Sequence, residues 1–191
     1  NAEQHNVQII DHLLDSARQV PSPNCGDRPK QDDIDLIVIH SISLPPGQYG
    51  GEQIEQFFCN ELDCAEHPYF RQIEGLEVSA HLLIRRSGEV VQFVPFNRRA
   101  WHAGESSYMG RSNCNDFSIG IELEGTDEEA YEQEQYQQLA KVCFALEAAY
   151  QGVSLQGIAG HSDISPGRKT DPGKGFDWQY FSSLLKAIGA E

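Results

Sequence analysis

The sequence predicts a single α/β domain with a central mixed β-sheet flanked by helices on both faces. Three observations support this prediction. The length of 191 residues fits one domain. Apolar segments typical of strands alternate with helical segments, and a hairpin turn joins two of the strands, so the sheet is mixed rather than purely parallel. We divide the chain into an N-terminal helix and extended connector, residues 1–33, packed on a domain formed by residues 34–191.

The first two elements differ in their apolar pattern. Residues 6–18 are predicted to form an amphipathic helix, because Ile9, Leu13 and Leu14 fall on one side of it. Prolines end this helix, and a polar connector follows. Residues 35–40 form a continuous apolar run rich in β-branched side chains. Such a run predicts a strand buried on both faces in the middle of the sheet.

The middle of the chain predicts a short helix, a hairpin and a long loop. The helix is expected over residues 52–60, after a loop rich in proline and glycine. Residues 78–85 and 89–94 are predicted to be two strands joined by the turn Arg86-Ser87-Gly88. Residues 97–115 are polar and contain glycines, which predicts a loop. Structureless loops of this length are usually functional.

The last third predicts two helices separated by a short strand. Glu124, at the end of a strand, is expected to be solvated. Thr126 and Glu129 have the spacing of a capping box, so a helix is predicted to begin there. Residues 157–160 are predicted to be a strand, and Asp177 is expected to cap the final helix.

Composition restricts the partners and the compartment. The net charge of −15 disfavours nucleic acid and anionic membrane surfaces as partners. No apolar run is long enough to span a membrane, and the N-terminal residues carry no secretory signal pattern. The five cysteines are odd in number and scattered, which favours reduced thiols over a disulfide framework. We therefore expect a cytoplasmic monomer.

Residues 160–173 combine a candidate metal ligand, a lysine and an aspartate in a segment rich in proline and glycine. Such a segment favours neither helix nor strand and is predicted to be a loop. A catalytic zinc ion takes three protein ligands, often imidazole and carboxylate, plus water. His161 and Asp171 are candidates for two of these ligands, and the third must come from elsewhere in the chain.

Six other histidines compete for the third position, and His40 is the strongest candidate. It ends the most apolar strand, and ligand sites in open α/β sheets lie beyond the carboxyl ends of strands. A purely structural role is the alternative. The other histidines have plainer interpretations: solvent-facing for His5 and His12, a surface turn for His67, a hydrogen-bonded core position for His81, and a pocket-lining position for His102.

Glu122 is the candidate for proton transfer. Residues 118–124 alternate, so Glu122 faces away from the apolar side of the strand, and Gly120 leaves room beside it. A carboxylate in a central strand is costly unless it is paired or functional. One interpretation is an ion pair with Arg85 or Arg98. The other is a general acid or base whose pKa is raised by burial.

Lys169 lies two residues before Asp171 and has two interpretations. It is either an ordinary exposed lysine or a cation that stabilises a developing oxyanion. Arg168, beside it, is interpreted as a surface residue or as a support for the site.

Taken together, these motifs resemble the zinc-dependent N-acetylmuramoyl-L-alanine amidases, in particular the cytoplasmic AmpD type that acts on 1,6-anhydro-muropeptides. The resemblance covers nearly the whole chain and rests on several long motifs in the same order. These motifs are residues 17–23, 38–47, 78–81, 99–104, 114–125 and 161–173.

The resemblance implies a site and a reaction. It implies that His40, His161 and Asp171 bind Zn²⁺ and that Glu122 and Lys169 act in catalysis, within a zinc amidase domain of residues 34–191. The implied reaction cleaves the amide bond between the lactyl group of (1,6-anhydro-)N-acetylmuramic acid and L-alanine, in muropeptide recycling. The implied substrate is an anhydro-muropeptide. Residues in regions that line the family's cleft are Ser41, Ala100, Trp101, His102 and Leu123.

Three positions depart from the family pattern. Ser41 stands where asparagine is common, and Glu77 and Asn113 stand where arginine is common. Arginine would suit the carboxylates of a stem peptide, so these departures affect the expected peptide preference rather than the zinc chemistry.

Two alternative functions remain open on the sequence. One is a peptidoglycan-binding module without catalysis, which the presence of all three ligand types disfavours. The other is an amidase that acts on intact cell-wall peptidoglycan outside the cytoplasm, which a signal peptide would favour.

Overall fold

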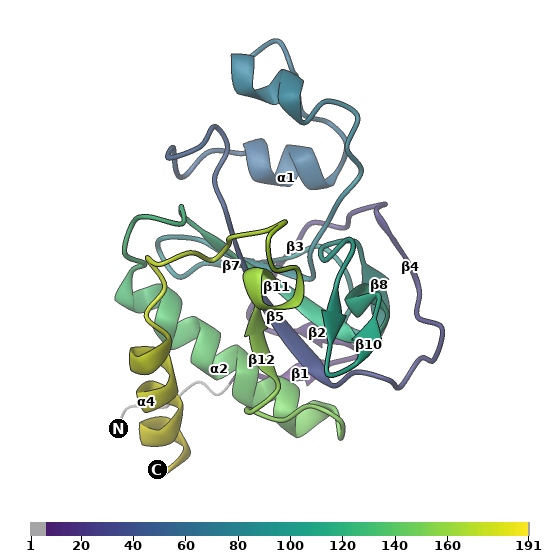
Figure 1. Cartoon of the computed structure of the whole chain (residues 1–191), viewed down its shortest axis with the longest axis vertical. Helices are drawn as coiled ribbons and strands as arrows, with labels where there is room; N and C mark the ends of the chain where they lie inside the picture. Colours follow the sequence, from purple (N-terminus) through teal and green to yellow (C-terminus); the bar gives the residue numbers. More distant parts are fainter. Residues whose placement is uncertain (1–6, 191) are drawn as a thin grey trace.

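The structure is a computed structural model that describes residues 7–190, and a six-stranded sheet lies at its centre (Figure 1). The strand order is β12-β5-β11-β6-β7-β3. Neighbouring strands are parallel except at the β6–β7 hairpin, so the predicted mixed sheet is confirmed. The strands are β3 (Arg18–Gln19), β5 (Leu36–Ile42), β6 (Leu82–Ile84), β7 (Val90–Gln92), β11 (Ser118–Glu124) and β12 (Ile158–Gly160).

Short strand pairs and helices complete the described chain. The pairs are β1 (Ile9–Ile10) with β2 (Leu13–Leu14), β4 (Cys25–Asp27) with β8 (Arg98–Ala100), and β9 (Ser107–Tyr108) with β10 (Arg111–Ser112). The helices are α1 (Gln53–Phe58), α2 (Gln133–Ala149), α3 (His161–Ile164) and α4 (Trp178–Gly189), with 3₁₀ turns η1 (Pro68–Gln72) and η2 (Cys114–Asp116). No helix within residues 7–190 is long and apolar enough to cross a membrane.

Helices cover both faces of the sheet, as predicted. On one face, Ile121 of β11 and its neighbours pack against α2 and α4 in the largest apolar cluster. On the other face, Leu83 and Val91 pack against Phe57 and Phe58 of α1. Each large apolar side chain buried in this way stabilises the fold by about 1.5–3 kcal/mol. The predicted central strand is confirmed, because β5 lies between β12 and β11 and residues 36–39 are all fully buried.

The prediction of an N-terminal helix over residues 6–18 is wrong for the part that the structure describes, and position 6 lies outside that part. The chain forms the β1–β2 hairpin instead. Asp11 and His12 have positive φ angles of 50° and 65°, as a tight hairpin turn with the twist of its strands requires. Leu14 is 1% exposed, and its N–H donates to Gln92 of β7. These distant contacts override a local spacing that also fits a helix.

Two histidine predictions fall in the same region. His5 lies outside the described residues. His12 is half-buried rather than solvent-facing, and its Nδ1 lies 2.7 Å from the hydroxyl of Tyr150, the residue that follows α2. The segment before residue 34 is also integral to the fold, since β3 joins the edge of the central sheet.

The predicted start of the long helix at Thr126 is wrong. The N–H of Glu129 does donate to Thr126 Oγ1 (3.2 Å), but α2 begins at Gln133, where Glu132 and Gln135 form the capping box. Residues 125–131 instead contact the loop that carries Asp171. Tertiary hydrogen bonds therefore take the place of the first helical turns.

Two predicted loops contain regular structure. Residues 97–115 include β8, β9 and β10, and residues 160–173 begin with the single turn of α3. The other predicted elements are confirmed within a few residues, including α1, β6, β7 and β12. Asp177 caps α4 by accepting a hydrogen bond from the N–H of Tyr180 (2.9 Å).

Candidate active site

Three parallel strands, β5, β11 and β12, bring the predicted site residues to one edge of the sheet. His40 on β5 pairs in register with Glu122 on β11, so both side chains lie on the face opposite α2. Gly160 of β12 pairs with Ile39, and His161 follows at once as the first residue of α3. The carboxyl ends of parallel strands meet at a common edge, which explains why residues far apart in sequence converge here.

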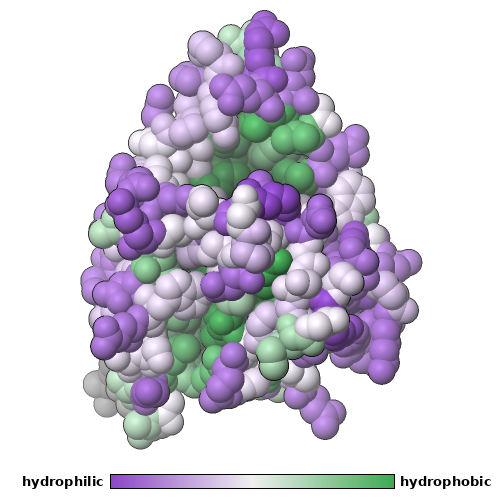
Figure 2. Space-filling view, in the orientation of Figure 1, coloured by the Kyte–Doolittle hydropathy of each residue, from purple (hydrophilic) through white to green (hydrophobic). Residues whose placement is uncertain are grey.

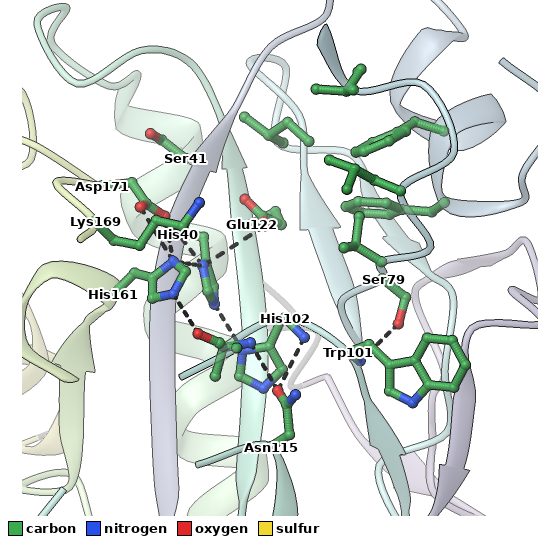
Figure 3. A pocket seen from close by; sticks show the side chains of 18 of the residues that line it. His40, Ser41, Ser79, Trp101, His102, Asn115, Glu122, His161, Lys169 and Asp171 are labelled. Carbon is green, nitrogen blue, oxygen red and sulfur yellow. Dashed lines mark hydrogen bonds and ion pairs between the residues drawn. The ribbon is translucent and has the colours of Figure 1, made fainter. Parts of the chain in front are cut away.

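The three predicted metal ligands lie together (Figure 3). His40 Nδ1 is 3.0 Å from His161 Nδ1 and 3.2 Å from Asp171 Oδ2, and His161 Nδ1 is 3.3 Å from the same oxygen. The Asp171 loop is held in place because the N–H of Ser162 donates to the Asp171 carbonyl (3.0 Å). The structure therefore brings together the set that the sequence singled out.

The donor atoms fit a divalent metal. His161 Nε2 lies 2.9 Å from the carbonyl oxygen of Ala103. A carbonyl only accepts, so Nε2 carries the ring proton and Nδ1 presents its lone pair to the centre of the group. Two imidazole nitrogens and a carboxylate facing one point would repel each other unless a cation lay between them. This donor set and its open side match a three-ligand zinc site.

The electrostatics favour the forms that bind a metal. Burial lowers the pKa of His40, which favours neutral imidazole. Burial alone would raise the pKa of Asp171, but when His161 and His40 are protonated at Nδ1, their hydrogen bonds outweigh it and hold that pKa well below the usual range, and a cation between bare Nδ1 atoms would favour the carboxylate in the same way. Neutral imidazole and ionised carboxylate are the ligand states that a metal requires.

Glu122 is buried without an arginine or lysine partner in the part of the chain that the structure describes. It is 8% exposed, its Oε1 is 3.9 Å from His40 Nδ1, and its Oε2 has no hydrogen-bond partner among the described residues. Burial, and then the charge of Asp171, raises its pKa well above the ordinary value, and Lys169 opposes this in part. Such a carboxyl at the edge of a groove suits a general acid or base.

The alternative interpretation of Glu122, an ion pair with Arg85 or Arg98, does not hold. Arg85 donates to Glu124 at 3.0 Å, and Arg98 donates to Asp27 at 2.5 Å. The expectation that Glu124 is solvated is wrong for the same reason. Glu124 is only 2% exposed, because Arg85 and the neighbouring strand cover it.

Lys169 and Arg168 have different environments. Lys169 is exposed on the wall of the groove, and its side chain extends toward His40 and Glu122 (Figure 3). Arg168 donates to the carbonyl of Ala103 (2.6 Å), which also accepts from His161. Arg168 therefore supports a candidate ligand, as the second of its two interpretations stated.

The ligands open onto a groove of about 710 Å³. One wall carries the candidate ligands, and the other is apolar, formed by Phe57, Ile73, Leu76 and Val78. Figure 2 shows hydrophobic side chains gathered in a hollow at the level of α1. This wall could not be predicted from the sequence, because apolar residues near α1 give the same pattern whether they face a core or a groove.

The predicted substrate contacts divide into two groups. Ser41, Trp101 and His102 line the groove. Ala100 and Leu123 do not, because their side chains are 0% and 1% exposed and pack into the apolar clusters on either side of the sheet. Alternation along β11 places Leu123 on the face opposite Glu122, which excludes it from the groove.

Two of the positions that depart from the family pattern, Glu77 and Asn113, lie in different places. Glu77 lines the groove. Asn113 lies outside it, beside a second hollow near Ser106. Asp127, which no sequence pattern marked, also lines the groove and accepts hydrogen bonds from Ser41 (3.1 Å) and Thr170. The segment containing Asp127 has a helical capping signature, which concealed this role.

Comparison with known proteins places the chain in a family. Residues 30–174 match the family model for N-acetylmuramoyl-L-alanine amidase. The chain is 56% identical over 172 residues, 90% of its length and 91% of the relative's, to 1,6-anhydro-N-acetylmuramyl-L-alanine amidase AmpD of Citrobacter freundii.

Two solved structures are also similar. The crystal structure of a selenomethionine AmpD derivative has a TM-score of 0.90 and 54% identity, covering 93% of this chain and 98% of that one. Escherichia coli AmiD, in complex with its substrate anhydro-N-acetylmuramic acid-L-Ala-D-gamma-Glu-L-Lys, has a TM-score of 0.59 and 25% identity, covering 93% and 65%. The chain therefore belongs to the N-acetylmuramoyl-L-alanine amidase family and is an amidase of that family.

Proposed function

We propose that this protein is a zinc-dependent amidase that cleaves the bond between the lactyl group of 1,6-anhydro-N-acetylmuramic acid and L-alanine, in cytoplasmic muropeptide recycling. The observation that carries the proposal is the convergence of His40, His161 and Asp171 beside the buried Glu122 in one groove. The names of the relatives support the substrate, since AmpD is named for anhydro-muramyl-L-alanine amidase activity and AmiD was solved with an anhydro-muropeptide.

His40, His161 and Asp171 would hold the zinc ion, which lowers the pKa of a water molecule and polarises a carbonyl group. Glu122, ionised, accepts the proton of the attacking water and delivers it to the leaving nitrogen of L-alanine. Its raised pKa suits both steps, because a carboxyl with a pKa closer to neutral accepts and returns a proton more readily.

Lys169 and the groove walls supply charge and orientation. The Lys169 ammonium, at the groove beside Glu122, stabilises the negative charge that develops on the carbonyl oxygen. The apolar wall formed by Phe57, Ile73 and Leu76 excludes water from one side of the substrate. Glu77 adds negative charge to the groove, so we expect weaker binding of stem peptides with several carboxylates.

The test is mass spectrometry of a purified anhydro-muropeptide after incubation with the protein. We expect release of free peptide and anhydro-muramic sugar, loss of this activity with a chelator and recovery with zinc. Intact substrate in the presence of zinc would favour a binding module. Cleavage of intact sacculi in preference to soluble muropeptide would favour an amidase of the cell wall.

A further inference from the structure

His102 is buried at the floor of the groove, and both of its ring nitrogens are engaged (Figure 3). Its Nδ1 lies 2.8 Å from Nε2 of His40. Its Nε2 lies 3.0 Å from Oγ of Ser118, and that hydroxyl lies 2.6 Å from the carbonyl oxygen of Cys114. The four groups form one continuous chain of hydrogen bonds that ends at a candidate metal ligand.

The Cys114 carbonyl determines which atom donates and which accepts in each of these hydrogen bonds. The Cys114 carbonyl only accepts, so the single proton of the Ser118 hydroxyl points to it. The Ser118 oxygen must then accept, which places a proton on Nε2 of His102. Neutral His102 therefore has a bare Nδ1, which accepts from His40, and His40 carries its own proton on Nε2.

We propose that His102 is a positioning residue that selects the tautomer and ring orientation of His40. With the proton on Nε2, His40 presents the lone pair of Nδ1 toward His161 and Asp171. The proposal rests on the metal site of the proposed function and assigns His102 a role through His40 rather than contact with the reacting atoms. Partners of this kind orient metal-binding histidines in other proteins.

The surroundings hold the His102 ring in one place. A Cβ added to Gly120 would lie 2.4 Å from Cγ of His102, so only glycine leaves space for the ring. The space beside Gly120, which the sequence predicts to be room next to Glu122, is therefore filled by the His102 ring. The backbone N–H of His102 donates to Asn115 Oδ1 (3.0 Å), and Arg28 donates to the carbonyls of Asn115 (3.2 Å) and Ser118 (2.9 Å).

The first test measures the tautomer directly in the wild-type protein without metal. Nitrogen-15 chemical shifts of the imidazole rings, recorded at about pH 8 where histidine is ordinarily neutral, distinguish a protonated from a bare ring nitrogen. We expect a proton on Nε2 of His40 and of His102. A proton on Nδ1 of His40 would overturn the proposal, whether or not the protein binds zinc.

The second test measures zinc affinity by competition with a chromophoric chelator. His102→Leu removes the acceptor for His40, and we expect zinc to bind about 10–100-fold more weakly. His102→Asn keeps an acceptor near the position of Nδ1 and should restore much of the loss. His12→Leu, which removes a half-buried hydrogen-bonded histidine outside the site, is the matched control and should leave the affinity unchanged.

The outcomes separate this proposal from the proposed function. Unchanged zinc affinity in a folded His102→Leu variant would refute the positioning role and leave the amidase intact. Failure of the wild-type protein to bind zinc would refute the metal site itself. If His102→Leu does not fold, Ser118→Ala, which removes the bond to Cys114 but keeps both rings, provides the same comparison with a smaller expected loss.

Discussion

At the scale of single residues, Glu122 has the least favourable environment of the described carboxylates in the groove. It is buried in a central strand, and no arginine or lysine of residues 7–190 lies within ion-pair distance of it. Natural proteins place such groups where function requires them, at a cost in stability. Glu122 should therefore affect activity and stability in opposite directions.

The first prediction concerns activity. Glu122→Gln keeps the shape of the side chain but cannot accept a proton, so kcat should fall about 10²–10⁴-fold. Zinc content, measured by atomic absorption, should stay at the wild-type value, because Glu122 is not one of the three candidate ligands. A variant with wild-type turnover would exclude Glu122 as the general base.

The second prediction concerns the stability of the metal-free protein. The pKa of Glu122 is raised in the folded chain, so below about pH 4 the carboxyl is protonated in both folded and unfolded chains and contributes little. As the pH rises, the unfolded chain ionises while the folded chain resists, and the wild type loses stability. Glu122→Gln should therefore raise Tm near pH 7 by a few degrees and have little effect near pH 4. Calorimetry at both values checks this, and equal shifts would contradict it.

At the scale of elements, residues 125–131 connect β11 to the loop that carries Lys169 and Asp171. The carboxylate of Asp127 accepts from Ser41 and Thr170, and its carbonyl accepts from the N–H of Gly175 (2.8 Å). Tyr131 donates to the carbonyl of Pro172 (2.9 Å). Since Thr170 lies between Lys169 and Asp171, this connection holds the backbone that carries both candidate residues.

The third prediction follows from that connection. Asp127→Ala removes the charged acceptor of two hydroxyl hydrogen bonds, of which the one from Ser41 is part-buried, so unfolding free energy should fall by about 1–3 kcal/mol. Zinc affinity and kcat should also fall, because the Asp171 loop loses its support. Asp27→Ala removes a carboxylate paired with Arg98 at the surface and should change stability by less than about 1 kcal/mol. Denaturant unfolding of both variants makes the comparison, and equal losses would contradict the prediction.

The sequence predicted the central strands well and singled out three candidate ligands that the structure brings together, because both carry strong local signals. A strand buried on two faces is a continuous apolar run, as in β5, and a His–Asp pair in a proline-rich loop has few structural interpretations. The hairpin at Asp11–His12 and the late start of α2 were mispredicted. Both depend on hydrogen bonds to distant residues such as Gln92 and Pro172, which no local pattern contains.

At the scale of the whole molecule, the net charge of −15 opposes an anionic substrate. Lys169 and a bound zinc ion would offset this charge at the site, but the long-range field of the protein still slows the approach of a muropeptide. The binding step should therefore depend on ionic strength.

The fourth prediction is that kcat/KM rises as salt is increased from about 0.01 to 0.15 M, because the Debye length falls from about 30 to 8 Å. The measurement is the initial rate at low concentrations of anhydro-muropeptide, with zinc saturation held constant. The control is an anhydro-muropeptide whose stem-peptide carboxylates are converted to amides, and its kcat/KM should show no increase. A decrease in kcat/KM for the muropeptide would mean that positive charge at the groove attracts the substrate more strongly than the net negative charge of the protein repels it.

The in-register pairing of His40 with Glu122 on β5 and β11 has a consequence for folding fidelity. A slip of either strand by one residue would turn an isoleucine, Ile39 or Ile121, toward the groove and press a histidine or a carboxyl into the apolar face beneath α2. The same alternation that sorts core from groove therefore rejects misassembled chains. Molecules that reach the stable fold are, by the same register, those with their reactive groups correctly aligned.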